Sequence, residues 1–501
     1  MTDSHIVALG HHEEHMRSLE LTLLFIVLSW TTWRFLARPR RRVDVSFAAA
    51  AFVIVGLHSA LEGVRAQMMP TYALLAALLA IALLRRRAAI DRTSTQRWAR
   101  IALAVPVVGW MVVAATLPSA FPVFRYDKPV GPYSVGTAVY ELKGAPKSRD
   151  LVVQVWYPIE PKRKGIAAGV TTHPALLEDA YASFTGLPKP LFDNLRLVKT
   201  HALVEVPMAR NPERFPIVLF SHGPLGANRS QSVFQLEALA SAGFVTVAID
   251  HTGYASTTIF PDGHAVPAGP DAAWPVFVDA QSTAMLQTWV SDVRFVLDRL
   301  EALDMSDPRH ILNGHLDLAR IGYVGASFGG SVVVQALLDE PRIKAGVAED
   351  GKPYFSPRTL TDLRRPLMYM QSAAPYIKST DAQLARWGLT GASFRAAEQD
   401  HYARQMELFG RTAGPIYNVY IRRTNHVTFS DLDLIVRIPN PDLMDVRRAH
   451  RIINDYTIAF FDRYLKDESP ALVSGAAPSP YEEVTVASRN IQPAERLVRN
   501  R

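Results

Sequence analysis

Cysteine is absent from this sequence of 501 residues. Its absence excludes a disulfide framework, a thiolate zinc site and a cysteine nucleophile, so any nucleophile must be another residue type. The sequence shows no internal repeat and no long low-complexity tract. Because a single hydrophobic core stops growing at roughly 250 to 300 residues, a chain of this length should contain more than one structural region.

Lysine is missing from the first 121 residues, although most of the net positive charge lies there. This segment has 13 arginines and 7 acidic residues, a net charge of +6, whereas residues 122–501 have 41 basic and 40 acidic residues. The arginines flank apolar runs and do not alternate with aromatic residues on a basic patch. The charge therefore indicates a membrane partner and no nucleic-acid partner.

Four apolar runs fill the first 121 residues, at about residues 19–36, 45–61, 68–84 and 101–121. Each is close to the ~20 residues that a helix needs to cross the hydrocarbon core of a membrane. A cleaved signal peptide fits poorly, because the runs repeat and no basic segment precedes the first. The pattern predicts an N-terminal bundle of about four transmembrane helices.

Arginines also predict the orientation of these helices. They concentrate after the first and third runs, at Arg38, Arg40, Arg41, Arg42, Arg85, Arg86, Arg87, Arg92, Arg97 and Arg100. Basic loops remain cytoplasmic. With four spans, everything after residue 121 then lies on the outer side, and we expect a multi-pass protein of a bacterial inner membrane with a periplasmic or extracellular catalytic region. If one run only lies on the membrane surface, this orientation reverses.

Two polar groups interrupt the apolar quarter. His58 and Glu62 are one helical turn apart, and residues 11–16 read "HHEEHM". Each could be a proton or metal site, or an interfacial polar pair and a solvated tail. Because neither has a complete ligand set at metal spacing, we expect no metal and no cofactor.

The rest of the chain alternates between strand-like and helical patterns. A linker with four prolines, "LPSAFPVFRYDKPVGPYSVG", precedes the alternation. Strands and helices that alternate over more than 250 residues predict an α/β fold with a largely parallel sheet covered by helices on both faces. The expected domains are a transmembrane region at 1–121, a linker at 122–136, a catalytic domain at 137–466 and a loosely ordered tail at 467–501.

Residues 324–330, "VGASFGG", contain the spacing G-x-S-x-G around Ser327. The spacing occurs by chance, so its context decides between a nucleophile and an ordinary turn that needs small residues. "ARIGYVG" predicts a strand before Ser327 and "GGSVVVQALLDE" a helix after it. This is the setting in which a serine lies in a strained turn above the end of a sheet. The sequence therefore predicts that Ser327 is a nucleophile.

A nucleophilic serine requires a base and an acid, here in the order Ser, Asp or Glu, His. His426 follows the strand "IYNVYIR" in a loop, whereas His401 and His450 lie in helical stretches. His426 is therefore the expected base.

Asp350 is the expected acid, because it ends the strand "IKAGVAED" that follows the nucleophile helix. Glu349 is its neighbour, but adjacent strand residues face opposite ways, so only one can orient the imidazole. Asp362 and Asp381 remain weaker alternatives.

An oxyanion hole should combine the amide of Phe328 with an amide from the loop "FSHGPLGANR". Pro224 has no N–H, so the second donor is expected at Leu225, with Gly226 as an alternative. His222 precedes the serine by a hundred residues and is expected to support this loop. The stretch 253–277, rich in Pro, Gly and aromatic residues, could be a lid or an ordinary loop.

Several segments carry a family resemblance: "FPIVLFSHGPLGANR", "DLARIGYVGASFGG", "KAGVAEDGKPYF" and "NHVTFSD". In this order they resemble the platelet-activating factor acetylhydrolase family (plasma type, isoform II) and its bacterial relatives in the α/β-hydrolase superfamily. The resemblance covers about residues 130–465. It implies an α/β-hydrolase fold, with the nucleophile at Ser327, the acid at Asp350 and the base at His426. The charge at Glu349 and the longer loop through Pro224 depart from the family pattern.

The resemblance implies a calcium-independent serine esterase that removes short acyl groups from the sn-2 position of phospholipids. The function expected is therefore that of a membrane-anchored carboxylic ester hydrolase. Three alternatives remain open. They are an esterase for non-lipid esters or polyesters, an acyltransferase that uses the same triad, and a non-catalytic membrane protein with an α/β-hydrolase domain that binds a ligand or partner.

Overall fold

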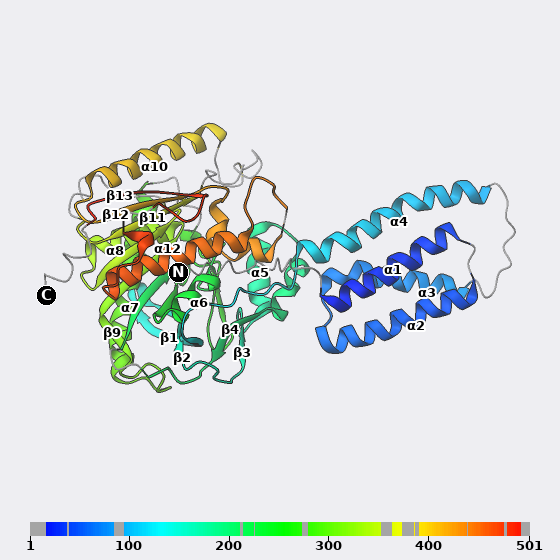
Figure 1. Cartoon of the computed structure of the whole chain (residues 1–501), viewed down its shortest axis with the longest axis horizontal. Helices are drawn as coiled ribbons and strands as arrows, with labels where there is room; N and C mark the ends of the chain where they lie inside the picture. Colours follow the sequence, from blue (N-terminus) through cyan, green and yellow to red (C-terminus); the bar gives the residue numbers. More distant parts are fainter. Residues whose placement is uncertain are drawn as a thin grey trace, which may run out of the picture. The chain divides into compact units, whose positions relative to one another are not determined.

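A computed structural model describes residues 17–491 except 38–39, 85–94, 211–213, 225, 273–278, 352–362, 373–384, 386–389, 438 and 475–477. The chain forms two compact units. The first, here called the helical unit, comprises the chain up to Phe124 together with Pro188–Val198 and Leu434–Ile438. The remaining residues form the second, the sheet unit. Figure 1 shows the elements of both.

The helical unit consists mainly of long apolar helices. Its elements are α1 (Ser18–Leu36), α2 (Arg41–Leu57), the π-helical turn η1 (His58–Glu62), the 3-10 turn η2 (Ala66–Met68), α3 (Met69–Leu84) and α4 (Thr95–Ala120). Side chains such as Trp30 and Met68 are buried between helices, whereas Phe25 and Phe52 are 71% and 82% exposed. Apolar groups therefore cover the outside of this unit as well as its inside, as suits a lipid environment.

Three helices among the described residues are long and apolar enough to cross a membrane: Ser18–Leu36, Arg41–Glu62 and Ala66–Leu84. The sequence predicted about four. The fourth prediction falls in α4, where the apolar stretch Ala104–Ala120 is shorter. Two of the arginines that precede this stretch, Arg97 and Arg100, lie within the helix itself. Three candidate spans are therefore present in the described chain.

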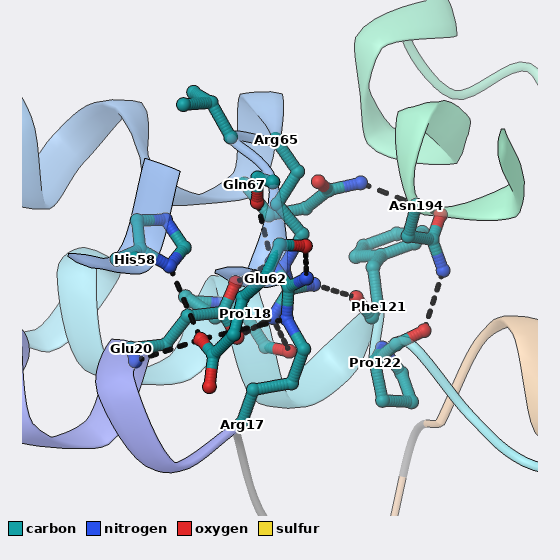
Figure 2. A network of polar contacts seen from close by, with 12 residues as sticks. Arg17, Glu20, His58, Glu62, Arg65, Gln67, Pro118, Phe121, Pro122 and Asn194 are labelled. Atoms are coloured by element: carbon teal, nitrogen blue, oxygen red, sulfur yellow. Dashed lines mark hydrogen bonds and ion pairs between the residues drawn. The ribbon is translucent and has the colours of Figure 1, made fainter. Parts of the chain in front are cut away.

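A buried ion pair connects the ends of several helices in this unit (Figure 2). Arg65 donates to both carboxylate oxygens of Glu20, at 2.7 and 2.8 Å, and the two side chains are 1% and 0% exposed. Arg65 also donates to the carbonyl oxygens of Pro118, at 3.2 Å, and Phe121. One guanidinium group thus joins the start of α1, the turn after α2 and the end of α4.

The helical unit also contains a segment from the middle of the sequence, the 3-10 helix η4 (Lys189–Leu197). Asn194 donates to the carbonyl oxygen of Pro122 at 2.6 Å (Figure 2). Gln67 donates to the carbonyl oxygen of Leu191 at 2.8 Å. In sequence, η4 lies within the predicted catalytic domain 137–466. In the structure, η4 packs instead with the helices, because its backbone carbonyls and Asn194 satisfy polar groups there.

The sheet unit is built on an 11-stranded mixed sheet with the order β13-β12-β11-β10-β9-β5-β6-β2-β1-β4-β3. The strands are β1 (Ser134–Ala145), β2 (Arg149–Ile159), β3 (Ala167–Gly169), β4 (Lys199–Val204), β5 (Phe215–Ser221), β6 (Val245–Asp250), β9 (Leu316–Ala326), β10 (Ile343–Glu349), β11 (Leu367–Ser372), β12 (Ile416–Ile421) and β13 (Val484–Arg489). The six strands from β6 to β12 in this order are parallel. Their carboxyl ends consequently meet at one edge.

Helices cover this sheet in two packed pairs. They are α6 (Val233–Ser241) with α12 (Val446–Leu465), and α7 (Asp279–Met305) with α8 (Phe328–Asp339). Other elements are α5 (Pro174–Thr185), α10 (Gly391–Arg411) and the hairpin of β7 (Thr257–Ile259) and β8 (Ala265–Pro267). The central strands are apolar on both faces, as β5 and β6 show with every residue buried. A parallel sheet between helix layers requires this composition.

Part of the predicted loosely ordered tail 467–501 has regular structure. Val484–Arg489 forms the edge strand β13, antiparallel to β12. Val484 pairs with Ile421 and Val486 with Val419. The short run "VTVASR" alternates between more and less exposed positions, which is the pattern of an edge strand with one face on the sheet. The surrounding Pro, Ser and Glu residues concealed it.

Candidate active site

Ser327 and Asp350 each begin the loop after one of two neighbouring parallel strands. Ala326 at the end of β9 is in register with Glu349 at the end of β10. The N–H of Ser327 donates to the carbonyl oxygen of Glu349 at 2.8 Å. The sheet therefore places the expected nucleophile and the expected acid side by side at its carboxyl edge.

The backbone at Ser327 has the strained form of a nucleophile turn, with φ 57° and ψ −123°. A Cβ at Gly325 would lie 2.2 Å from the carbonyl oxygen of Gly329, and one at Gly329 would lie 2.1 Å from that of Ser221. Only glycine permits this approach of strand, turn and helix. The predicted sequence of strand, sharp turn and helix is present, and the two glycines of the motif have a steric reason.

The structure brings Asp350 and His426 together. His426 opens the 3-10 turn η7 (His426–Phe429) after β12, and its Nδ1 is 2.9 Å from Asp350 Oδ2. Ser372 donates to the same carboxylate through its N–H, at 3.0 Å, and its hydroxyl, at 2.8 Å. Burial acts to raise the pKa of Asp350, but the hydrogen bonds from His426 and Ser372 outweigh burial and lower the pKa. The group is thus a carboxylate that fixes the imidazole ring.

The other candidates for base and acid are placed differently. His450 is buried in α12, and its ring stacks on that of Phe234 with 3.6 Å between the ring centroids. Burial lowers the pKa of His450 to about 3, as suits a core histidine. His401 lies in α10. Asp362 and Asp381 lie outside the described residues.

Glu349 points away from this pair and into the core. Its carboxyl group is fully buried and accepts a 2.5 Å hydrogen bond from Gln235. Burial raises the pKa of Glu349 to about 8, with a further contribution from the charge of Asp350. Burial therefore favours the neutral form of this acid, which is paired with an amide.

The expected oxyanion donors are only partly described. Phe328 begins α8, with its ring buried edge-on against Trp289 at 5.3 Å, whereas Leu225 lies outside the described residues. The N–H of Gly226, the alternative donor, is hydrogen-bonded to the carbonyl oxygen of Pro224 at 2.7 Å. A Cβ at Gly223 would be 3.1 Å from that of Ser327, so this loop lies directly against the nucleophile.

Sequence reasoning missed the side chains beneath this loop. His222 is buried, as expected for a supporting residue. Its neighbour in space is His251, whose backbone N–H donates to His222 Nε2 at 3.3 Å. His251 in turn contacts Ser221 and Asp292. The signal was the pair "SH" and "DH" directly after two apolar strand patterns, which places four polar residues at one sheet edge.

The polar groups considered for metal are accounted for where they are described. His58 uses both ring nitrogens, with Nδ1 3.1 Å from Glu62 Oε2 and Nε2 2.6 Å from the Tyr72 hydroxyl. The motif at residues 11–16 lies outside the described residues. Within the described part of the chain, no three His, Asp or Glu side chains are grouped as metal ligands.

Comparison with known proteins identifies relatives of this chain. A family model described as platelet-activating factor acetylhydrolase, isoform II, matches residues 121–386. A platelet-activating factor acetylhydrolase from Cavia porcellus is 28% identical over 250 residues, which are 45% of this chain and 55% of that protein. A probable 1-alkyl-2-acetylglycerophosphocholine esterase from Arthroderma benhamiae is 27% identical over 261 residues, 48% and 61% of the two chains. The chain thus spans about half the length of these curated relatives.

A similar solved structure is the ferulic acid esterase from Streptomyces cinnamoneus. The two share 25% sequence identity and a TM-score of 0.56, over 73% of this chain and 99% of that one. The mixed sheet with its parallel centre and helical layers is accordingly an α/β-hydrolase fold. The family match includes Ser327 and Asp350, ends before His426, and leaves residues 1–120 outside.

Proposed function

This chain belongs to the platelet-activating factor acetylhydrolase, isoform II, family, and on that premise we propose that it is a serine carboxylic ester hydrolase. Ser327 is the nucleophile, His426 the base and Asp350 the acid. The substrates are phospholipids with short sn-2 acyl groups. The helices of the helical unit anchor the enzyme in a membrane.

One observation carries the proposal. His426 Nδ1 is 2.9 Å from an Asp350 oxygen, while Ser327 lies in a strained turn whose N–H is bonded to the residue before Asp350. Since a carboxylate that accepts from Nδ1–H fixes the ring tautomer, Nε2 is left as the proton acceptor. An ordinary strand-to-helix turn needs neither the strain at Ser327 nor a carboxylate bonded to a loop histidine.

The reaction follows from these roles. His426 Nε2 takes the proton of the Ser327 hydroxyl as its oxygen attacks the ester carbonyl, and the amide of Phe328 with one from the Leu225 loop stabilises the oxyanion. The protonated imidazole returns the proton to the leaving alcohol, which leaves an acyl group on Ser327. Water attacks this acyl-enzyme, again with His426 as the base, and releases the acid.

The names of the relatives and the apolar helices both support a lipid ester as the substrate. The names of the curated relatives refer to platelet-activating factor and to 1-alkyl-2-acetylglycerophosphocholine, an sn-2 acetyl phospholipid. Anchoring by apolar helices holds an active site close to the surface where such esters are concentrated. We propose that α4 completes a fourth span, that the arginine-rich loops face the cytoplasm and that the sheet unit lies on the outer side.

A second candidate is an esterase for non-lipid esters. The similar solved structure is named for ferulic acid, an aromatic acid. The match to this chain covers 99% of that structure's chain. The loop at 220–229 is here called the oxyanion loop. An exposed aromatic ring, that of Phe184, lies against Gly226 in this loop, and a Cβ at Gly226 would be 2.4 Å from the ring. Such a ring can pack on an aromatic acyl group as well as on a lipid chain.

The test uses the full-length protein in detergent with three substrate panels. These are phospholipids with acetyl, short oxidised or long sn-2 chains, feruloyl and other aromatic esters, and p-nitrophenyl acetate. We expect the highest kcat/KM for acetyl phospholipid. If only the aromatic or p-nitrophenyl esters are hydrolysed, the lipid assignment is wrong.

Two variants separate the mechanism from the substrate. Ser327→Ala should abolish hydrolysis of every ester and labelling by a fluorophosphonate. Ser241→Ala removes another buried hydroxyl, bonded to the Tyr133 carbonyl, and should retain both. Full hydrolysis by Ser327→Ala would refute the mechanism. No hydrolysis and no labelling in the parent protein would indicate a binding protein instead.

A further inference from the structure

We propose that a second Ser–His–Asp arrangement, buried beneath the oxyanion loop, positions that loop against the nucleophile. It comprises Ser221, His251 and Asp292, here called the buried array. This inference rests on the proposed esterase function. Its members are positioning residues, because none of them reaches the substrate.

The geometry resembles that of a catalytic triad. Ser221 Oγ is 2.8 Å from His251 Nε2, and His251 Nδ1 is 3.0 Å from Asp292 Oδ2. All three residues are 0% exposed. An ester carbonyl cannot reach the Ser221 hydroxyl, so the array is sealed from substrate and does not act as a second nucleophile.

In each hydrogen bond of the array, the donor and the acceptor can be assigned. Asp292 is placed to accept from Nδ1–H, which leaves Nε2 to accept the Ser221 proton. Burial lowers the pKa of His251 despite the opposing effect of Asp292, which favours this neutral ring. The Ser221 oxygen is then free to accept from the Tyr323 hydroxyl at 2.6 Å. Arg149 donates to the other oxygen of Asp292 at 2.5 Å. A network in which every donor has one acceptor holds its members in one orientation.

The array joins two of the chain segments that form the proposed active site. Ser221 is the last residue of β5, from which the chain continues through His222 to Gly223 beside Ser327. Tyr323 lies on β9, the strand that ends at the nucleophile turn. The hydroxyl contact between Ser221 and Tyr323 therefore connects the oxyanion loop with the nucleophile strand.

His251 holds the loop by a second route. The backbone N–H of His251 donates to His222 Nε2. The proton of the His222 ring is therefore on Nδ1, which donates to the Gly223 carbonyl oxygen. His251 also stacks on Trp289 at 3.8 Å, and Trp289 meets the ring of Phe328 edge-on at 5.3 Å. The array is thus linked to the loop through His222 and to Phe328 through Trp289.

The expected consequence concerns the transition state more than the substrate. Oxyanion donors act at 2.7–3.1 Å from the developing charge, and a misplacement of about 1 Å costs on the order of 100-fold in rate. The ground-state ester makes little use of the oxyanion hole. A loosened loop should therefore lower kcat and leave KM nearly unchanged.

The experiment compares Ser221→Ala with Ser241→Ala in the full-length enzyme. Both remove one hydroxyl from a residue that is 0% exposed, but Ser241 donates to the Tyr133 carbonyl and has no contact with the array. We measure kcat and KM on the best ester substrate, normalised to the sites titrated by a fluorophosphonate, and the inhibition constant of phenylboronic acid, which forms a tetrahedral adduct with serine.

We expect Ser221→Ala to lower kcat by about 10- to 100-fold and to weaken phenylboronic acid by a similar factor, with KM within twofold. Ser241→Ala should leave all three within twofold. Tyr323→Phe keeps the ring and removes the hydroxyl that contacts Ser221. It should lower kcat by a smaller factor than Ser221→Ala. This variant replaces Ser221→Ala in the test if Ser221→Ala does not fold.

If folded Ser221→Ala or Tyr323→Phe keeps the parent kcat and phenylboronic acid affinity, the inference is overturned. A loss that only follows the titrated fraction of sites overturns it too. Failure of the proposed function looks different, since the parent enzyme would then hydrolyse no ester or would not be labelled at Ser327.

Discussion

The N–H of Ser327 donates a 2.8 Å hydrogen bond to the carbonyl oxygen of Glu349. This single backbone contact joins the turn that carries the proposed nucleophile to the strand that carries the proposed acid. Because neighbouring strands are about 4.8 Å apart, the separation of the two loops is set by the sheet itself. His426 comes from β12, two strands beyond β10, and is held by the Asp350 carboxylate instead.

Replacement of Asp350 by asparagine should lower kcat by about 10⁴-fold, because an amide can stabilise the wrong imidazole tautomer. Steady-state hydrolysis and fluorophosphonate labelling rates measure the effect, and both should fall. Asp339→Asn, at the exposed end of α8, is the matched control and should retain the parent kcat. A kcat within tenfold of the parent for Asp350→Asn would remove Asp350 from the triad.

Gly223→Ala should impair catalysis without preventing folding. The added methyl group would lie 3.1 Å from Ser327 Cβ and 3.4 Å from its Oγ, tighter than ordinary contact, so the loop must shift. We expect kcat to fall about 10- to 100-fold, with the melting temperature little changed. Gly410→Ala, where the nearest side-chain atom is 3.9 Å away, should leave kcat unchanged. Equal activity of both variants would mean that the loop does not lie against the nucleophile.

The buried carboxyl of Glu349 should make stability depend on pH. Its pKa is raised by burial to about 8 in the folded protein, against 4.5 for an unperturbed glutamate. Its contribution is therefore fully present below pH 4.5 and is lost as pH rises through about 8. Glu349→Gln keeps the hydrogen bond with Gln235 and cannot ionise. It should therefore be more stable than the parent at pH 8 to 9, by a gain on the order of 1–3 kcal/mol, and not at pH 5.

Glu340→Gln supplies a control of the opposite sign. Burial acts to raise the pKa of Glu340, but hydrogen bonds from Arg342 lower it overall. Its contribution is present above pH 4.5 and is lost as pH falls through the lowered value. This variant should be less stable than the parent at neutral pH, with the difference shrinking in acid. Thermal unfolding of the parent and both variants from pH 4 to 9 measures these trends. Parallel curves for Glu349→Gln and the parent would contradict a buried neutral Glu349.

Arg65→Met should destabilise the helical unit. It leaves the buried Glu20 carboxylate with Arg17 alone, at 2.6 Å, and frees the carbonyls at the end of α4. Loss of one partner of a buried ion pair costs about 3 kcal/mol or more. Thermal unfolding in detergent should show a lower first transition. Glu20→Gln combined with Arg65→Met should restore part of the loss, since the buried carboxylate is then removed and Arg17 keeps Glu62 as its partner.

Removal of an exposed ion pair serves as comparison. Arg404→Ala breaks the contact with Asp400 on α10, where Asp400 is 54% exposed, and should change stability by less than about 1 kcal/mol. If Arg65→Met and Arg404→Ala unfold at the same temperature, the buried pair does not hold the helices together.

Much of the sheet unit could be predicted because its signals are local. Apolar runs such as those of β5 and β6 and the alternating helices lie within short windows, and the G-x-S-x-G spacing is read directly beside them. The short edge strand β13 could not be found this way. Its six residues acquire strand structure only by pairing with β12.

The sequence by itself determined which residues make up the proposed site and their order along the chain: Ser327 after one strand, Asp350 after the next, and His426 after a later one. Parallel strands bring their carboxyl ends to one edge, so these positions had to be close. Only the tertiary structure decided what surrounds them, because the partners come from distant segments. It paired Glu349 with Gln235, built the array of Ser221, His251 and Asp292, and packed η4 among the helices. Hydrogen bonds between buried groups far apart in sequence leave no local periodicity, so only the folded chain reveals them.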